Sequence, residues 1–500
     1  MNILSKFKNL FKPIDLTQGK IWKTILIFFI PIVLSYLFQQ VYTLTDSIIC
    51  GQFLKATEVA GVNNSNAVTF LSLQFAMGLA SGFSVVVSKK IGENNKVDAR
   101  KSILIQLIFG AIIGILITIV FIFLIKPILL WMDIKPSDID ISGNEVYEAA
   151  YLYTLIIVIG TTAVLFYNIM LGILRAIGDS FVPFIFLVCS TILNVGLDLL
   201  FIVVFKWAVF GAAFATVVSQ FIAFIGCFIY TFLRYKDLRI KKEDFHFSFN
   251  YILNHFKLGL PLAFQFSVLG IGIIVMQAAV VAFDKTPAGL VVNLTPATNG
   301  IGVGYKLNNF LMCIINALGT AMLSYCGQNY GAKKYDRIKK GINQAIIIGL
   351  ILCGFIILVG FLFTINGFYM HLFLNEDKIN DDVIKYGNLY LYTILPFYPT
   401  LMVLFIYRNA LQGIEKPLWP FLAGIGELVG RVLICMFIPP LINGGVINST
   451  ASNLSFITVC LGDPLAWIFA DVIMIPAIIK YIYKCNPDKF KILTNKLLIN

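Results

Sequence analysis

The chain has 500 residues, of which 59% are hydrophobic and only 13% are charged. Soluble globular proteins are about 45–50% apolar and about 25% charged, so this composition excludes a soluble multi-domain enzyme and a disordered chain. The apolar residues come in long runs rather than in alternation, which excludes a membrane β-barrel. We therefore expect an all-α integral membrane protein.

A membrane-spanning helix needs about 20 mostly apolar residues, and twelve segments of this chain meet that requirement. We predict spans at approximately 24–48, 59–87, 102–125, 149–171, 182–205, 209–233, 252–283, 297–327, 341–365, 384–411, 418–440 and 457–483.

The basic residues predict the orientation of these spans. If the N-terminus is cytoplasmic, the inner segments hold 28 of the 38 Lys and Arg residues and the outer loops hold 7. Cytoplasmic loops of membrane proteins carry such an excess, so we expect both termini in the cytoplasm. The net charge of +12 is then a topology signal and a means of contacting membrane lipid. No nucleic-acid partner is expected.

An internal duplication organises the chain. Residues 174–184 align with residues 411–421 at an offset of 237, and Pro31 aligns with Pro261 at an offset of 230. Each half holds six spans, an even number, so both halves enter the membrane in the same orientation and are related by a pseudo-two-fold axis along the membrane normal. We predict a cytoplasmic N-tail at 1–20, an N-lobe at 21–234, a cytoplasmic linker at 235–251, a C-lobe at 252–484 and a cytoplasmic C-tail at 485–500.

Ionisable groups inside the spans are candidate functional groups, because each costs about 2.5–3.5 kcal/mol to insert. Asp46 ends a polar stripe on the first span, and Asn194 and Asp198 share one face of the fifth. With Thr216 on the sixth span, these residues are predicted to converge in the outer half of the N-lobe. Their oxygens suit a hard cation such as Na⁺, or a proton shared by the carboxylates, rather than a transition metal. Alternatively, Asp198 caps a neighbouring helix and Asp46 lies among the outer headgroups.

The C-lobe carries different charges. Glu427 and Arg431 are four residues apart, and we predict that they form an internal salt bridge that stabilises the bundle. Lys306 is grouped with them as a structural charge, although it could also pair with an acid or contact substrate. Arg408 lies near the cytoplasmic end of its span and could extend to the interface. The seventh span has no acid before Asp284 at its outer end. Ion coupling is therefore expected in the N-lobe.

Three stretches resemble the multidrug and toxic compound extrusion (MATE) transporters of the MOP flippase superfamily, especially the DinF-like branch. Residues 38–51 resemble the first helix of that family, residues 172–180 its loop after helix four, and residues 327–337 its loop after helix eight. The resemblance extends over about residues 20–484. It implies a V-shaped pair of six-helix lobes that export drugs, toxic compounds or metabolites in exchange for Na⁺ or H⁺ by alternating access.

The resemblance also implies roles for individual residues. The DinF-like cation site corresponds to Asp46, Asn194, Asp198 and Thr216. The N-lobe substrate cavity corresponds to Gln39, Tyr42 and Asn168. NorM-like members use acids on helix seven, which the interior of the seventh span lacks here. We expect a monomer in a bacterial cytoplasmic membrane, an amphipathic or cationic small-molecule substrate, and no cofactor beyond the coupling ion.

Two other classes of function would need different residues. A flippase for lipid-linked oligosaccharides or lipids, from the same superfamily, would need a cationic cavity, for which Lys306 and Arg431 are the obvious candidates. A membrane-embedded enzyme would need intramembrane histidines, paired acids with a nucleophile, or a catalytic loop. The longest loops, of about twenty residues, carry no such set. We therefore expect a transporter rather than an enzyme.

Overall fold

The structure is a computed structural model that describes residues 12–132, 134–136, 141–374, 376 and 379–484. Within these ranges, twelve helical segments are long and apolar enough to cross a membrane, which confirms the predicted number. The same ranges contain no β-strand beyond one isolated bridge between Lys285 and Val291. Helices are the expected result, because in hydrocarbon a segment must satisfy its own backbone hydrogen bonds.

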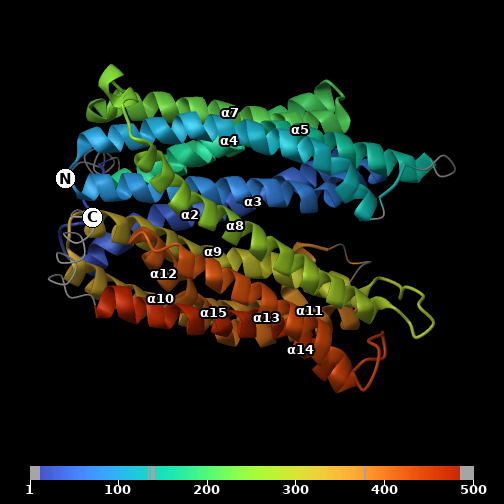
Figure 1. Cartoon of the computed structure of the whole chain (residues 1–500). Coiled ribbons are helices and arrows are strands. Elements are labelled where there is room, and N and C mark those ends of the chain that lie inside the picture. The colour runs from blue at the N-terminus through green and yellow to red at the C-terminus, as the bar shows by residue number, and fades with distance from the viewer. Residues whose placement is uncertain (1–11, 133, 137–140, 375, 377–378, 485–500) are drawn as a thin grey trace, which may run out of the picture. The chain divides into compact units, whose positions relative to one another are not determined.

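The chain divides into two compact units, and in its described part the first unit holds residues 12–16 and Leu26–Ser267. Its helices, coloured from blue to green in Figure 1, are α2 (Ile21–Phe53), α3 (Ala56–Gly92), α4 (Lys96–Trp131), α5 (Ile141–Ile177), α6 (Phe181–Asp198), the π-helix η1 (Leu199–Val204) and α7 (Ala208–Arg234). Helix α3 packs against α5, and α5 packs against α7. Phe83, Ile103, Met170 and Leu174 are fully buried or nearly so in the core of this unit.

The second unit holds residues Thr17–Ile25 and the described chain from Val268 onward. The divisions therefore fall inside α2 and inside α8, whose part up to Ser267 belongs to the first unit. Its helices are α8 (Phe249–Val281), α9 (Pro296–Gly331), α10 (Tyr335–Thr364), the 3₁₀ segment η5 (Ile365–Leu372), α11 (Asp381–Ile394), α12 (Tyr398–Gly413), α13 (Leu418–Asn443), α14 (Asn453–Cys460), α15 (Gly462–Ile478) and the π-helix η8 (Ile479–Tyr483). Helix α9 packs against α12, and α13 packs against α15.

Three predicted spans are interrupted where the backbone changes its hydrogen-bonding pattern. The span 384–411 is divided into α11 and α12 by the 3₁₀ turn η7 (Leu395–Phe397), and one residue, Leu461, separates α14 from α15. Prolines explain the first interruption, because Pro396 and Pro399 have no N–H to donate. The fifth span continues from α6 into η1, where Phe205 N–H donates to Leu200 O at 2.9 Å, five residues earlier.

The region predicted as a linker is attached to α4 by two ion pairs. Arg100 Nε lies 2.8 Å from Asp244 Oδ2, and Lys96 Nζ lies 2.6 Å from Asp237 Oδ2. Burial alone would raise the pKa of Asp244, but the hydrogen bonds from Arg100 and from the backbone N–H of Lys241 outweigh it and lower that pKa. The hydrogen bond from Lys96 lowers the pKa of the exposed Asp237. These contacts fix the linker to the first unit.

Candidate cation and substrate site

Two acidic side chains, one half-buried and one fully buried, meet in the first unit. Asp46 lies on α2 and is half-buried, while Asn194 and Asp198 lie one turn apart at the end of α6 and are fully buried. The carboxyl groups of Asp46 and Asp198 lie close enough to interact electrostatically. The convergence expected from helix faces is therefore present in the structure.

The polar atoms of these three side chains are largely unpartnered. One carboxyl oxygen of Asp46, both oxygens of Asp198 and both polar atoms of Asn194 are buried and have no hydrogen-bond partner in the part of the chain that the structure describes. The alternative in which Asp198 caps a neighbouring helix is therefore wrong. Two carboxylates this close cannot both be ionised in a low-dielectric site without a proton or a cation between them. This pair of carboxyl groups can hold either a proton or a cation.

Three further side chains surround the two carboxyl groups. Tyr42, Cys50 and Tyr153 all lie within electrostatic range of both. Cys50 follows Asp46 by one helical turn, which was a usable signal in the sequence. Tyr153 lies on α5, and no local pattern linked it to α2. Its position depends on how the helices pack, which sequence reasoning did not resolve.

Thr216 occupies a bridging position at this site. It lies on α7, and its hydroxyl donates to Ala212 O at 3.2 Å. The hydroxyl of Tyr42 donates to Thr216 Oγ1 at 3.4 Å. Tyr42 is itself one turn before Asp46 on α2. A single hydrogen bond thus joins α2 to α7 beside the two carboxyl groups.

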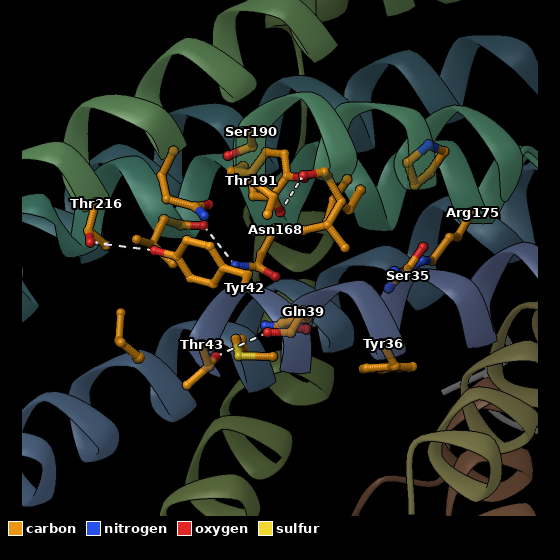
Figure 2. Close-up of a pocket in the computed structure, with 18 residues that line it drawn as sticks. Ser35, Tyr36, Gln39, Tyr42, Thr43, Asn168, Arg175, Ser190, Thr191 and Thr216 are labelled. Atoms are coloured by element: carbon orange, nitrogen blue, oxygen red, sulfur yellow. Dashed lines mark hydrogen bonds between the residues drawn. The ribbon is translucent and has the colours of Figure 1, made fainter. Parts of the chain in front are cut away.

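A cavity of about 240 Å³ lies next to this bridge. Figure 2 shows Gln39, Tyr42, Asn168 and Thr216 around it, so the three residues predicted for a substrate cavity do line one cavity together with Thr216. Asn168 is held by a bond from its Nδ2 to Val164 O at 2.8 Å. Sequence reasoning missed the other polar residues of the lining, which are Ser35, Tyr36, Thr43, Tyr167, Arg175, Ser190, Thr191 and Gln220.

Asp46, Asn194 and Asp198 are not among the residues that line the cavity. Tyr42 belongs to both places, because it lines the cavity and lies within electrostatic range of both carboxyl groups. Thr216 also lines the cavity and is joined to Tyr42 by a hydrogen bond. The described residues contain no group of three or more His, Cys, Asp or Glu side chains that could hold a metal ion. A cation here would therefore depend on the amide oxygen of Asn194 and the hydroxyl of Thr216 as well as on the carboxylates.

The intramembrane charges of the second unit are paired differently from the prediction. Glu427 Oε2 lies 3.9 Å from Arg431, as expected, but Glu427 also binds Arg408 directly. The principal partner of Arg431 is Asp463, at 2.6 Å. The expectation that Arg408 extends to the interface is wrong, since this residue is only 4% exposed. Lys306 has no carboxylate partner among the described residues, and its ammonium group lies 5.7 Å from the centre of the Phe373 ring.

The chain matches a known family model and several relatives. A model of the family described as MatE matches residues 31–200 and 273–437. The "Probable multidrug resistance protein YpnP" of Bacillus subtilis is 28% identical over 405 residues, covering 80% of this chain and 84% of that protein. The "Probable multidrug resistance protein YoeA" of the same organism is 24% identical over 369 residues, covering 72% and 75%.

Solved structures with the same fold cover almost the whole chain. A crystal structure of MATE in complex with MaL6 superposes with a TM-score of 0.80 at 20% identity, covering 95% of this chain and all of the other. An outward-facing multidrug resistance MATE family transporter of the MOP superfamily gives a TM-score of 0.80 at 22% identity, covering 95% and 99%. The chain therefore has the fold of these two proteins and is a multi-pass membrane protein.

Proposed function

Since this chain belongs to the MatE family, we propose that it is a secondary active antiporter that exports drugs, toxic compounds or metabolites in exchange for Na⁺ or H⁺. Its relatives are named as multidrug resistance or multidrug export proteins, which supports this assignment. Its substrate is an amphipathic or cationic small molecule. The protein acts as a monomer within the lipid of a bacterial cytoplasmic membrane, has both termini in the cytoplasm, uses no cofactor and catalyses no chemical reaction.

The coupling ion binds at Asp46, Asn194, Asp198 and Thr216. The support for this assignment is the set of buried, unpartnered oxygens on Asp46, Asn194 and Asp198. A proton or Na⁺ that enters from outside relieves the repulsion between the two carboxylates. A carboxylate in a membrane span is costly unless it has such a partner, so the occupied site and the empty site favour different conformations.

The substrate binds in the cavity lined by Gln39, Tyr42 and Asn168. The observation that carries the coupling proposal is the hydrogen bond from Tyr42 to Thr216, because both residues line the cavity and Tyr42 lies within electrostatic range of both carboxyl groups. Ion binding at Asp46 and Asp198 changes the position of this bridge and so the affinity of the cavity for substrate. A ligand shifts a two-state protein only by such a difference in affinity. The lobes then alternate between inward and outward access.

Substrate efflux from proteoliposomes under separately imposed Na⁺ and pH gradients tests this proposal. Asp198→Asn is expected to abolish the response of efflux to either gradient, because the second carboxyl group is lost. Asp237→Asn is the matched control, since this acid is exposed on the linker and pairs with Lys96; its efflux is expected to equal that of the wild type. Unchanged gradient-driven efflux in Asp198→Asn would contradict the proposal.

The flippase alternative has less support. A flippase would need free cationic groups that could hold a pyrophosphate. Arg431 is not free, because it pairs with Asp463 and also lies near Glu427. Lys306 is then the remaining candidate of the two, and a single ammonium group is a weak basis for binding a doubly charged headgroup.

A further inference from the structure

A row of buried charged side chains crosses the interior of the second unit and is not used by the proposed ion site. It begins with Arg408 on α12, which binds Glu427 on α13. Glu427 lies 3.9 Å from Arg431, and Arg431 Nε lies 2.6 Å from Asp463 Oδ1 on α15. All four side chains are less than 10% exposed. We call these four residues and Asp471 the charge row.

Asp471 is the member of the charge row without an ion pair. It lies on α15, two helical turns after Asp463, and is 7% exposed. Its Oδ1 is buried and has no hydrogen-bond partner in the described part of the chain. The groups that face it are Arg408 and Tyr407 from α12 and Glu427 from α13, all within electrostatic range.

The charges of the row do not balance when every acid is ionised. Two guanidinium groups face three carboxyl groups, and Glu427 and Asp463 already occupy the two guanidinium groups. An ionised Asp471 would therefore leave one net negative charge inside the membrane, where desolvation makes it costly. One proton on Asp471 makes the row neutral.

The position of Asp471 along its span places its carboxyl group deep in the membrane. Asp471 is about 18 Å from the end of η8 at a rise of about 1.5 Å per residue, and the hydrocarbon core is about 30 Å thick. The carboxyl group thus lies near the middle of its span. Trp467 lies one turn from Asp471 and one turn from Asp463 on the same helix and is 3% exposed. It can report changes of charge at either acid.

We propose that Asp471 is a proton-exchange site of the second unit, which gains and loses one proton as the charge row changes between neutral and singly negative. The site belongs to a different unit from Asp46 and Asp198 and binds its proton independently of them. It adds one proton to the transport cycle beyond whatever ion the first unit carries. The proton comes from water on one side of the membrane and is released to water.

Infrared difference spectroscopy of the full-length protein in lipid nanodiscs tests this assignment. The background is the double variant Asp46→Asn and Asp198→Asn, which removes the two carboxyl groups of the proposed ion site. As the pH is raised, the carbonyl band of one protonated carboxyl group is expected to disappear and a carboxylate band to appear. Asp471→Asn in the same background is expected to lack both changes. Asp463→Asn removes one negative charge from the row, so an ionised Asp471 then leaves the row neutral and both changes are expected to move to lower pH.

A second readout shows whether the variants are folded. In a variant of this protein that keeps Trp467, the other four tryptophans are replaced with phenylalanine. Its tryptophan fluorescence is expected to change over the same pH range as the infrared bands. The change is expected to be lost when Asp471→Asn is added. A melting temperature close to the parent shows that the loss is not unfolding. The proposal is overturned if the Asp471→Asn spectrum titrates like its parent, or if the Asp471 carboxyl band stays protonated at every pH. Neither result bears on ion coupling through Asp198.

Discussion

Arg100 and Asp244 form a two-point ion pair although they are 144 residues apart in the sequence, with Nε–Oδ2 at 2.8 Å and Nη2–Oδ1 at 3.2 Å. The Asp244 side chain is fully buried and that of Arg100 is 8% exposed. Removing one partner of a buried pair leaves an uncompensated charge. We therefore expect Asp244→Ala to lower the free energy of unfolding by about 3–5 kcal/mol, measured by denaturation of the protein in detergent.

The second ion pair of the linker is the control for that prediction. Asp237 also pairs with a cation on α4, but its side chain is 69% exposed and that of Lys96 is 56% exposed. Water and salt screen such pairs, so Asp237→Ala is expected to leave the stability unchanged. If Asp237→Ala and Asp244→Ala lower the free energy of unfolding equally, burial does not control the strength of these ion pairs.

The same pair predicts how stability responds to acid. Hydrogen bonds from Arg100 and the backbone of Lys241 lower the pKa of Asp244 in the folded protein despite its burial. An acid with a lowered folded pKa contributes stability above its unfolded pKa of about 3.9 and loses it as the pH falls through the folded pKa. The wild type should therefore lose more stability than Asp244→Ala below about pH 4. If the free energies of unfolding of the wild type and of Asp244→Ala fall in parallel as the pH is lowered, the lowered pKa of Asp244 is not the cause of the acid sensitivity.

The Tyr42 hydroxyl is expected to carry the coupling between ion and substrate. Tyr42→Phe removes the hydrogen bond to Thr216 but keeps the ring that lines the cavity. A net contribution of about 0.5–1.5 kcal/mol predicts a change of about two- to ten-fold in the effect of the ion on substrate affinity. Substrate binding measured with and without the coupling ion gives this ratio.

Tyr167 offers a matched control for the tyrosine exchange. It also lines the cavity, but its buried hydroxyl has no hydrogen-bond partner among the described residues. Tyr167→Phe should leave the ion effect unchanged. If Tyr167→Phe and Tyr42→Phe alter the ion effect equally, the Tyr42–Thr216 bond is not the connection between the two sites.

Gly82 allows α3 and α8 to approach closely. A Cβ at Gly82 would lie 2.5 Å from the Cα of Gly259 and 2.6 Å from Leu258 O, so backbone atoms would have to move. We expect Gly82→Ala to cost about 1–3 kcal/mol, as other overpacked sites do. A lower melting temperature in detergent would confirm it.

Gly196 is the control for this helix contact. It lies on α6, and a Cβ there would meet nothing within 4 Å. Alanine is favoured over glycine inside a helix by about 0.5–1 kcal/mol, so Gly196→Ala is expected to leave the melting temperature unchanged or raise it. A loss at Gly196 equal to that at Gly82 would rule out the steric explanation.

Most of the fold could be predicted from the sequence because membrane insertion constrains it strongly. Long apolar runs predicted twelve helices, and the structure has them. Helix faces predicted that Asp46 converges with Asn194 and Asp198, since Asp46 ends a polar stripe on the first span and the other two, four residues apart, share one face of the fifth. The division between α11 and α12 at Pro396 was not predicted, because transmembrane helices often tolerate proline and the run stays apolar across it.

The charge pairs of the second unit were harder to predict than its helices. Glu427 and Arg431 are close in sequence, and their local spacing was sufficient to pair them. The pairing of Glu427 with Arg408, and of Arg431 with Asp463, depends on how three helices pack. One signal was missed: Asp463 and Asp471, eight residues apart in an apolar segment, share a helix face and marked the buried face of the last span.

The π-helix η1 begins directly after Asp198 and therefore sets where this span can change in length. A π turn holds one residue more than an α turn, and here the extra residue lies between Leu199 and Val204. Deleting one residue from η1 would restore an ordinary α-helix while leaving the turns that carry Asn194 and Asp198 in place. A deletion of one residue within α6 would instead rotate those side chains by about 100° relative to the preceding turns. A one-residue change of length that leaves Asn194 and Asp198 in place is thus confined to the part of the span that follows Asp198.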